Sequence, residues 1–597
     1  MNTKKVTGST FLSSFFSLGT LSLIFFTPVS SADNNLASSA SAPSSQSASR
    51  LIKINQIGFL PDAKKLAVIP ANNATTFSVI KVGTQKIVLK NKLGEAAVWD
   101  PAQETVKLAD FSVLKEAGDY VLRVDGLTDS VSFHISADNY KELNATAIKS
   151  FYLNRASIEL TSKYAGAYAR AAGHADAKVL IHESAASTKR PTGTVISVPK
   201  GWYDAGDYNI YVVNSGISTY TLLAALEHFP DFYKSQILNI PESTNKVPDL
   251  LDEAMWNLEW MLAMQDPNDG GVYAKLTNKS FDGFVMPAQA NEPRYVVQKT
   301  TAAALDFAAV MAVASRVVAD YDTSFPGLSA KMLKASERAW AWAKANPAVL
   351  YRQPDDIKTG AYGDNNVSDE FAWAAAELYI TTKNDDYYRA MNAPQVLNSV
   401  PAWADVKGLA WISLAQHRKQ LTAIADQQLI ASRIEELANS LLAKTQTSAY
   451  GVAMQTEDFA WGSNSTAANQ AMMLIQAYRL TDKRDYLDAA QAQLDYILGR
   501  NATDYSFVTG FGAKPSMHPH HRISEADGVV APVPGMLVGG PQAGQQDLKN
   551  CPMGYPNKIP AKSYLDNVCS YASNEIAINW SSPLVYVSGA LQALTQK

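Results

Sequence analysis

Two carboxylates three positions apart, Asp204 and Asp207, lie in the segment GWYDAGDY at residues 201–208. If the turn is helix-like, this spacing places both side chains on one side of the chain, where they can share one water molecule. One carboxylate could abstract a proton from the water while the other orients it, and their mutual repulsion would raise one pKa. Asp and Gly are also common in polar turns, so a plain turn is the alternative. The neighbouring Trp202 and Tyr208 favour a catalytic role over a plain turn, because aromatic faces beside carboxylates suit stacking against sugar rings.

A third acid, Glu575, precedes the apolar run IAINW near the end of the chain, with Tyr571 close by. Burial among apolar groups disfavours the charged form of a carboxyl, so its pKa rises and it can act as a general acid near neutral pH. The alternative is a glutamate at a helix N-terminus, where the helix dipole stabilises its charge. Asp566 is a further acid of this stretch.

Residues 506–522, SFVTGFGAKPSMHPHHR, hold three of the eight histidines of the chain, His518, His520 and His521, followed by Arg522. These side chains could bind a metal, exchange protons or donate hydrogen bonds to substrate hydroxyls. The sequence lacks the HExxH spacing of a zinc helix, the GxSxG nucleophile elbow, the P-loop and the GxGxxG dinucleotide motif. Serine-nucleophile and nucleotide chemistry are therefore unsupported, and two acidic sites with a cluster of hydrogen-bond donors remain.

Composition excludes several classes of partner. A formal net charge of −4 without a basic run argues against nucleic acid or an anionic membrane as the main partner. With 47% hydrophobic residues over 597 positions, the chain can bury a large core in more than one domain. Cys551 and Cys569 are too few for a thiolate metal site, but they are candidates for one disulfide in an exported protein.

The first fifty residues read as targeting and linker segments. Lys4 and Lys5 precede an apolar run at residues 11–26, and small residues lead up to Ala32, so residues 1–32 are predicted to be a cleaved signal peptide of a secreted, extracellular or periplasmic protein. No later stretch reaches the roughly 20 apolar residues of a membrane span, so none is expected. Residues 33–50 are rich in Ser and Ala and are predicted to be a linker.

Two larger regions differ in the period of their apolar residues. At 51–138, short runs such as KLAVIP and TFSVIKV alternate with turn residues, which predicts a small β-sandwich. Residues 139–597 carry long alanine-rich helical patterns, among them 144–171, 247–264, 300–320, 368–382, 467–480 and 485–498. The 300–320 pattern is apolar on nearly all sides, as in the inner ring of a closed helical barrel. The three motif segments fall in long loops between helices, where function is usually located.

The motif segments together resemble the signature regions of glycoside hydrolase family 9, the inverting cellulases. The three regions are GWYDAGDYNIYVVNSG, SFVTGFGAKPSMHPHHR and YLDNVCSYASNEIAINWSSPLV, and further matches include YGDNNVSDEFAWAAAELY and WGSNS. The β-rich region, opening INQIGFLP, resembles the immunoglobulin-like module of one branch of this family. The resemblance implies a multidomain chain, with an immunoglobulin-like β-sandwich at 51–138 and an all-α (α/α)6 barrel at 139–597 whose open cleft crosses one end.

The resemblance also implies roles for the site residues. Asp207 would be the general base, Asp204 would help hold the water and Glu575 would be the general acid. His520 and Asp566 fall on the other active-site positions of the family, where contacts with the sugar in its ground state and transition state are expected. The expected sugar contacts are Trp202, Tyr208, His521, Arg522, Trp461 and Tyr571. Inversion needs the two catalytic carboxylates roughly 6.5 to 9.5 Å apart, so that a water fits between them and the sugar.

No cofactor is expected for the chemistry, and zinc is not expected as a structural metal. Relatives with the immunoglobulin-like module often bind zinc through two cysteines and two histidines. Ala156 and Gly173 stand at the cysteine positions of this chain, while His174 and His182 remain. Two imidazoles without thiolates make a poor zinc site.

Calcium is the structural metal that the sequence favours. Asp364, Asp369 and Glu370 offer the hard oxygen ligands that calcium needs, and they match a calcium loop of the family. The alternative is that these acids mark a helix N-terminus at Ser368.

The predicted activity is hydrolysis of β-1,4-glucosidic bonds in cellulose or related β-glucans, with inversion and in the endo mode. The alternatives on the same scaffold are exo action, as a cellodextrinase or β-glucosidase, and hydrolysis of glucosamine-containing chains. A catalytically silent sugar-binding protein would lack at least one catalytic carboxylate, and all are present in the sequence. We expect a monomer whose partner is its polysaccharide or oligosaccharide substrate.

Overall fold

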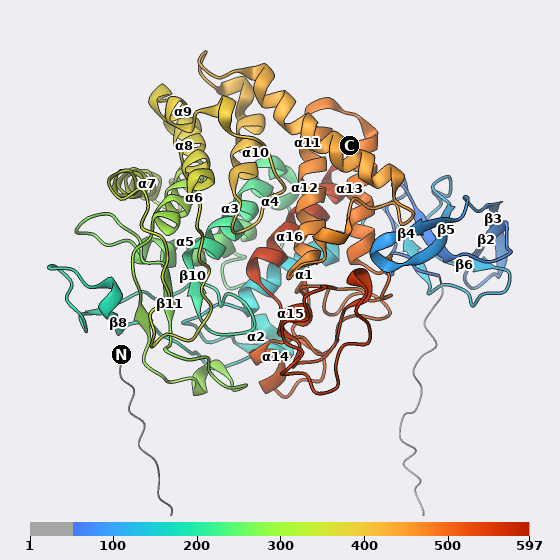
Figure 1. Ribbon diagram of the computed structural model, residues 1–597, viewed down its shortest axis with the longest axis horizontal. Coiled ribbons are helices and arrows are strands. Elements are labelled where there is room, and N and C mark those ends of the chain that lie inside the picture. The colour runs from blue at the N-terminus through green and yellow to red at the C-terminus, as the bar shows by residue number, and fades with distance from the viewer. Residues whose placement is uncertain (1–51, 596–597) are drawn as a thin grey trace, which may run out of the picture. The chain divides into compact units, whose positions relative to one another are not determined.

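The computed structural model describes residues 52–595, so the predicted signal peptide and linker lie outside the described residues. The first domain is a β-sandwich of two antiparallel sheets (Figure 1). One sheet has the order β1 (Leu66–Pro70), β5 (Glu104–Asp110), β4 (Ala97–Trp99). The other has the order β3 (Lys86–Lys92), β2 (Thr76–Lys81), β6 (Gly118–Val124), β7 (Phe133–Ile135). The β-sandwich prediction is confirmed.

Alternation of apolar residues forms the core of this sandwich. In β6, Tyr120, Leu122 and Val124 are buried, while the residues between them are not, because successive side chains of a strand point to opposite faces. Between the sheets, the ring of Phe59 meets those of Phe111 and Phe133 edge-on at 5.3 and 5.8 Å. The first domain therefore has its own apolar core.

The sandwich is tied to the helical domain by polar and aromatic contacts. Lys53 Nζ lies 2.8 Å from Glu104 Oε2 and donates to the Tyr450 hydroxyl at 2.9 Å. The same glutamate also pairs with Lys562 at 2.9 Å. The ring of Trp99, which is 3% exposed, stacks on Tyr450 with centroids 4.1 Å apart. These contacts bury the end of β4 against the helical domain.

The second domain is a double ring of helices (Figure 1). The inner ring consists of α3 (Val212–His228), α6 (Thr301–Ala319), α8 (Ser368–Thr382), α10 (Lys407–His417), α12 (Ser463–Thr481) and α16 (Ile578–Leu594). Each inner helix contacts the next, and α16 contacts α3, which closes the ring. The outer ring consists of α1 (Lys141–Leu153), α5 (Asp249–Ala263), α7 (Leu328–Ala345), α9 (Asp385–Met391), α11 (Gln427–Thr447) and α13 (Arg484–Ile497). This is the predicted (α/α)6 barrel.

Helix α6 shows why the inner ring is so rich in alanine. All of its residues from 301 to 315 are buried, because the helix packs against α3, α7 and α8. It is the one described helix that is long and apolar enough to cross a membrane, but 89% of that window is buried inside the protein. Its composition therefore reflects a core position in the barrel.

The predicted helix at 144–171 is wrong beyond Leu153, apart from the single turn of α2 (Ser162–Ala165). Helix α1 ends at Leu153, and the chain then becomes extended at Arg155, which forms an isolated β-bridge with Trp202. The fully buried guanidinium of Arg155 makes ion pairs with Glu242 at 3.1 Å and Glu253 at 2.9 Å. These tertiary contacts outweigh the helical propensity of the following residues.

A small sheet at the loop end of the barrel was not predicted. Its strands follow the order β10 (Ile210–Tyr211), β11 (Lys275–Thr277), β12 (Tyr295–Val296), β8 (Val179–Ile181), β9 (Val195–Ile196). Strands of two or three residues are too short to show alternation in the sequence. The sheet pairs Tyr211 with Lys275 and so joins the loop that carries Asp204 and Asp207 to the segment after α5.

Candidate active site

The three motif segments meet at Gly206. The Gly206 N–H donates to Glu575 Oε1 at 3.2 Å, and the Gly206 carbonyl accepts from the Arg522 N–H at 3.0 Å. His520 forms a parallel β-bridge with Glu575. A Cβ atom at position 206 would lie 2.1 Å from the His520 carbonyl oxygen, so only glycine allows this approach. Residues separated by hundreds of positions thus form one site.

Asp204 is 1% exposed, and both of its carboxylate oxygens are held. Asn214 Nδ2 donates to Oδ1 at 2.9 Å, and the Tyr362 hydroxyl donates to Oδ2 at 2.8 Å. Burial, with a further contribution from the negative charge of Asp207, raises the pKa of Asp204 to about 8, and these two hydrogen bonds oppose the rise. Asp204 is therefore fixed in place and suited to orienting a water.

Asp207 and Glu575 are the other two carboxyls of the site. Asp207 is 5% exposed, and its Oδ2 accepts a hydrogen bond from Asn209 Nδ2. Burial raises the pKa of Glu575 well above its usual value, and the charge of Asp207 adds to the rise. A carboxyl with a raised pKa keeps its proton near neutral pH and can give it to a leaving group. The site therefore offers a proton donor in Glu575 beside the carboxylate of Asp207.

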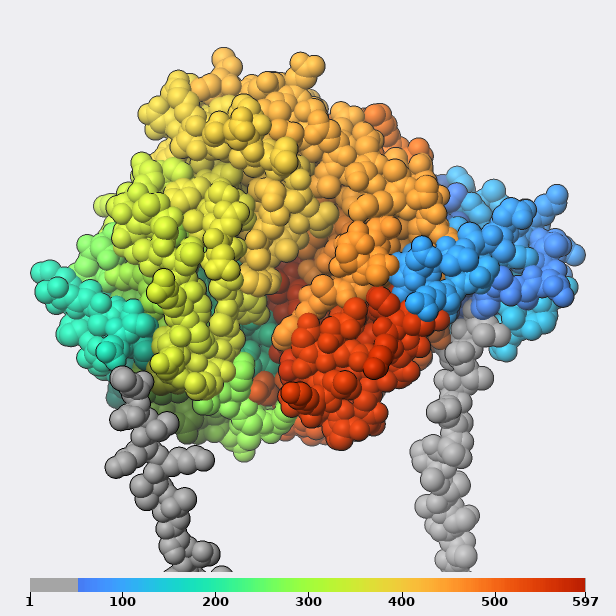
Figure 2. All heavy atoms as spheres, in the orientation of Figure 1, coloured from blue at the N-terminus to red at the C-terminus, as the bar shows by residue number. Residues whose placement is uncertain are grey.

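An open cleft of about 600 Å³ gives access to all three carboxyls. Its walls carry the aromatic residues Tyr211, Phe281, Tyr362, Trp403, Trp461 and Trp580. Figure 2 shows the surface hollowed between the yellow-green middle of the chain and its orange and red C-terminal third. Aromatic faces along an open groove suit the apolar faces of pyranose rings, while the carboxyls and amides between them suit the hydroxyl groups.

Trp461 and Tyr571, two of the predicted sugar contacts, lie at the rim of the site. Trp461 lines the cleft and is 46% exposed, and its ring packs against Tyr571 with centroids 5.5 Å apart. Tyr571 in turn lies edge-on to His520 at 6.0 Å. This pair therefore presents an aromatic surface to the cleft.

Three other predicted sugar contacts are buried beneath the loops. Trp202 has no exposed surface and donates from Nε1 to Glu253 Oε1 at 2.7 Å. Tyr208 is 1% exposed, and its hydroxyl donates to a backbone carbonyl at 2.5 Å. His521 is also 1% exposed and bonds through Nδ1 to Ser524 Oγ at 2.9 Å. None of them lines the cleft, so their assignment as sugar contacts is corrected to that of supports for the loops. An aromatic residue beside a carboxylate can stack on either a sugar or the protein core, and sequence alone does not distinguish the two.

Arg522, another predicted sugar contact, makes its observed contacts with other residues of the protein. Its guanidinium donates to the carbonyls of Gly206 at 2.8 Å and Asp282 at 2.9 Å, and it lies 5.3 Å from the ring centroid of Phe284. The side chain is 6% exposed. It therefore ties the loop of the two aspartates to the segment that carries Phe284.

Asp566 and His520 are joined through the loop at the start of the C-terminal motif. Both Asp566 oxygens accept from backbone N–H groups of Met517 and His518 at 2.9 to 3.2 Å. His520 Nδ1 donates to the Val568 carbonyl at 2.6 Å, and burial lowers the pKa of this imidazole, which favours its neutral form. Asp566 thus fixes the histidine segment, and its contact with sugar stays a prediction.

A disulfide closes the same loop. Cys551 and Cys569 are bonded, with their Cα atoms 5.3 Å apart. Cys569 follows Val568, the residue whose carbonyl holds His520. The candidate disulfide is therefore present, and it anchors the backbone that orients an active-site histidine.

Sequence reasoning missed several residues of the site. Tyr362 and Asn214 hold Asp204, and Trp403 and Trp580 line the cleft. Tyr362 lies in the motif YGDNNVSDEF, two residues before Asp364, and this position beside an acidic motif is the signal that the sequence offers for it.

The predicted calcium ligands gather around α6 and the start of α8. Asp369 and Glu370 lie in the first turn of α8, which begins at Ser368 as the sequence predicted. The carboxyl of Asp306 on α6 is buried with no hydrogen-bond partner. Burial and the charges of Asp306 and Asp369 raise the pKa of Glu370 to about 11. Within residues 52–595, no group of three or more His, Cys, Asp or Glu side chains is arranged as a metal site.

The two histidines of the zinc position have other partners. His174 Nδ1 bonds to the Tyr203 hydroxyl at 2.8 Å, and burial lowers the pKa of this imidazole to about 2. His182 Nε2 lies 3.1 Å from Asp356 Oδ1. The contacts of both rings are those of structural side chains.

Comparisons with known proteins agree with this architecture. The sequence profile described as Glycosyl hydrolase family 9 matches residues 140–588, and the one described as Cellulase N-terminal ig-like domain matches residues 47–129. The chain is 43% identical over 560 residues to a xyloglucan-specific endo-β-1,4-glucanase of Bacteroides ovatus, which covers 91% of this chain and 94% of that protein. It is 34% identical over 542 residues to Endoglucanase D of Acetivibrio thermocellus, with coverage of 90% and 82%.

Solved structures show the same relationship. A family 9 glycoside hydrolase of Bacteroides ovatus superposes with a TM-score of 0.85 at 40% identity, covering 92% of this chain and 99% of that one. A metagenome-derived family 9 endoglucanase superposes with a TM-score of 0.83 at 31% identity, with coverage of 91% and 99%. The chain therefore belongs to glycosyl hydrolase family 9 and is a glycoside hydrolase of the endoglucanase type, with an immunoglobulin-like domain before its catalytic barrel.

Proposed function

We propose that this protein is a secreted endo-β-1,4-glucanase that hydrolyses cellulose or related β-glucans with inversion. The observation that carries the proposal is the set of three carboxyls at one open cleft. Asp204, Asp207 and Glu575 all line it. Because the pKa of Glu575 is raised, its carboxyl keeps a proton that it can give to the leaving sugar.

In the proposed mechanism, one water displaces the leaving sugar in a single step. The water oxygen forms a bond to the anomeric carbon while the bond from that carbon to the glycosidic oxygen breaks. Asp207 takes a proton from the water, and Glu575 gives its proton to the departing oxygen. Asp204, held by Asn214 and Tyr362, orients the water. The two carboxyls regain their starting states by exchanging protons with solvent.

The shape of the cleft supports endo action on long or branched chains. The cleft is open and both Phe281 and Trp461 line it, which supports binding of a chain across the site without its end being held. The name of the Bacteroides ovatus relative adds xyloglucan to the β-glucans worth testing. Exo action would need one end of this cleft to be blocked.

The test follows the products released from cellopentaose and from xyloglucan oligosaccharides by NMR and chromatography. Wild-type protein is expected to release α-anomers of mixed length, and Glu575→Gln and Asp207→Asn are each expected to abolish turnover. Tyr379→Phe is the matched control, because the Tyr379 hydroxyl bonds to Thr422 at 2.8 Å and does not line the cleft. Initial β-anomers would refute inversion, and single-unit release would refute endo action.

We also propose a structural calcium bound by Asp364, Asp369 and Glu370. Four buried oxygens in this region have no hydrogen-bond partner among the described residues, which fits a cation binding among them: Asp364 Oδ2, Glu370 Oε2 and both oxygens of Asp306. A divalent cation would neutralise carboxyls that otherwise repel one another. Isothermal titration of the chelator-treated protein with calcium tests this, and absence of binding would refute it.

Export and a monomeric state complete the proposal. Export is supported by the signal-like residues 1–32, and N-terminal sequencing of the mature protein is expected to begin after Ala32. Sedimentation velocity is expected to show one species of monomer mass. A mature protein that retains Lys4 and Lys5 would refute export by this signal.

A further inference from the structure

A chain of hydrogen bonds leads from Asp207 into the protein behind the cleft. Asn209 Nδ2 donates to Asp207 Oδ2, and Asn209 Oδ1 accepts from Thr277 Oγ1 at 2.8 Å and from the Asn278 N–H at 3.0 Å. A backbone N–H can only donate, so the amide oxygen of Asn209 must face Asn278 and its NH₂ group must face the carboxylate. Asn209 therefore holds one oxygen of Asp207 and leaves the other, Oδ1, to the water.

The chain continues to a buried lysine. Thr277 Oγ1 lies 2.6 Å from Thr359 Oγ1, and Lys275 Nζ donates to Thr359 Oγ1 at 3.0 Å. Each hydroxyl has one proton, and that of Thr277 is directed to the amide oxygen of Asn209, which can only accept. Thr359 therefore donates to Thr277, and the proton of Thr277 is shared between Asn209 Oδ1 and the carbonyl of Asn278. Every hydrogen points from the lysine toward Asp207, a direction in which such bonds strengthen one another.

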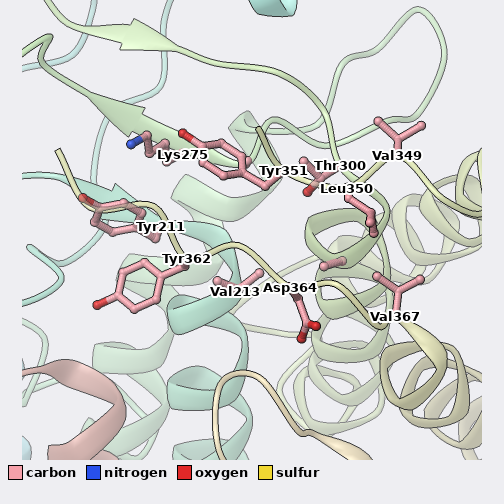
Figure 3. A pocket seen from close by; sticks show the side chains of 12 residues that line it. Tyr211, Val213, Lys275, Thr300, Val349, Leu350, Tyr351, Tyr362, Asp364 and Val367 are labelled. Atoms are coloured by element: carbon pink, nitrogen blue, oxygen red, sulfur yellow. The ribbon is translucent and has the colours of Figure 1, made fainter. Parts of the chain in front are cut away.

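Lys275 is held at the far end of this chain by groups that favour a cation. Its side chain is 1% exposed, and Nζ donates to the Gly360 carbonyl at 2.5 Å. The ammonium lies 5.3 and 5.5 Å from the ring centroids of Tyr211 and Tyr351, between which it is seen in Figure 3. Among the described residues Nζ makes no ion pair, and it donates to Gln353 Oε1 at 3.3 Å. Burial lowers the pKa of Lys275 to about 7, and the charge of Asp207 opposes this lowering. A buried ammonium without an ion pair is costly, which argues for a function.

The same lysine connects the two aspartates. Gly360, which it holds, lies two residues before Tyr362, whose hydroxyl holds Asp204. The register of β10 and β11 places Lys275 opposite Tyr211, the last residue of β10, which follows the aspartate loop. One cation thus supports the loop behind Asp204 and the hydrogen-bond chain behind Asp207.

We propose that Asn209, Thr277 and Lys275 are positioning residues for the hydrolysis: they hold the Asp207 carboxylate in the orientation that takes a proton from the attacking water. This inference rests on the proposed function, in which Asp207 is the base. The three residues act through Asp207 and need not touch substrate.

The test compares two substrates with different needs. Cellopentaose requires both the base and the acid, whereas a dinitrophenyl cellobioside has a leaving group that departs without a proton and therefore requires only the base. Asn209→Leu and Thr277→Val remove the hydrogen bonds and keep the side-chain shape. Each is expected to lower kcat about 10- to 100-fold on both substrates, with KM changed less than about two-fold. Glu575→Gln is expected to lose far more on cellopentaose than on the dinitrophenyl substrate.

Two further variants separate positioning from folding. Thr277→Ser restores the hydroxyl and is expected to return kcat to within about three-fold of wild type. Thr381→Val is the matched control for loss of a threonine hydroxyl, because Thr381 bonds only to a helix carbonyl, that of Ala312, and to Arg316 away from the cleft. It is expected to keep wild-type kcat on both substrates.

Each remaining outcome overturns the inference in a different way. Wild-type kcat in Asn209→Leu and Thr277→Val would show that the chain of bonds does not position the base. A loss of kcat accompanied by a fall in melting temperature, and not restored by Thr277→Ser, would assign these residues to folding. Wild-type protein that turns over neither substrate would refute the proposed function, and the inference with it.

Discussion

Replacing Tyr362 by phenylalanine tests how the site controls the charge of Asp204. The hydroxyl of Tyr362 is one of two side-chain donors to this carboxylate, and Asn214 is the other. The ring of Tyr362 lies edge-on to Trp403 at 5.1 Å, a contact that phenylalanine can keep. The substitution therefore removes one hydrogen bond from a buried carboxylate and leaves the wall of the cleft in place.

The expected size of the effect follows from the burial of Asp204. A hydrogen bond to a charged group contributes about 1.5 to 3 kcal/mol, and 1.36 kcal/mol corresponds to one pKa unit. The pKa of Asp204 is about 8 with both donors present. In Tyr362→Phe it should rise by about 1 to 2 pH units. Because a higher carboxyl pKa means ionisation only at higher pH, the fraction of ionised Asp204 at pH 6 should fall about 10- to 100-fold.

The assay is the pH dependence of kcat/KM on cellopentaose for wild type, Tyr362→Phe and the control Tyr379→Phe. The acidic limb of the Tyr362→Phe profile is expected to move to higher pH by about 1 to 2 units, and the control should follow wild type. Acidic limbs that coincide for all three proteins would refute the argument that Asp204 must be ionised and that Tyr362 supports its charge.

Three other substitutions or treatments have expected outcomes. Gly206→Ala places a Cβ atom 2.1 Å from the His520 carbonyl oxygen, so it should lower the free energy of unfolding by about 2 to 3 kcal/mol and abolish most turnover, as thermal unfolding and cellopentaose assays would show. Trp99→Ala removes the ring stacked on Tyr450 and should destabilise the protein by about 3 to 5 kcal/mol in calorimetry, whereas unchanged stability would mean that the two domains do not support each other. Chelation should lower Tm more at pH 8 than at pH 5. The reason is that the pKa of Glu370 is raised to about 11 in the folded protein, so metal-free stability is present below the unfolded pKa of about 4.5 and declines as pH rises above it. Equal losses of Tm at both pH values would contradict calcium binding at this cluster.

The fold could be predicted where one residue pattern controls one element. The pattern at 300–320 predicted a helix buried on all sides, and α6 covers Thr301–Ala319 in the inner ring. The 368–382 pattern coincides with α8. The prediction at 144–171 fails because Arg155 pairs with Glu242 and Glu253, which are distant in sequence. The short strands β10 and β11 are also set by tertiary pairing, and their own sequences are too short to indicate it.

The site shows the same division between local and distant determinants. The spacing of Asp204 and Asp207 is local, and the structure does place both at the cleft. The orientation of aromatic residues is not local: Trp202 turns inward to Glu253, while Trp461 lies on the cleft wall. Both residues are tryptophans, so only their packing partners decide which ring can contact a sugar.

The carboxyls of Asp204 and Glu575 differ in the number of hydrogen-bond donors around them. Two carboxyls, Asp204 and Glu575, have raised pKa values because burial and the charge of Asp207 both oppose ionisation. Their different hydrogen bonds separate their functions: Asp204 receives two side-chain donors that stabilise its charge, whereas Glu575 receives one backbone N–H, from Gly206. An acid with few donors keeps its proton and one with more donors loses it more readily. The surroundings therefore stabilise the charge of Asp204 more than that of Glu575, although burial raises the pKa of both, and the Tyr362→Phe profile measures the contribution of one such donor.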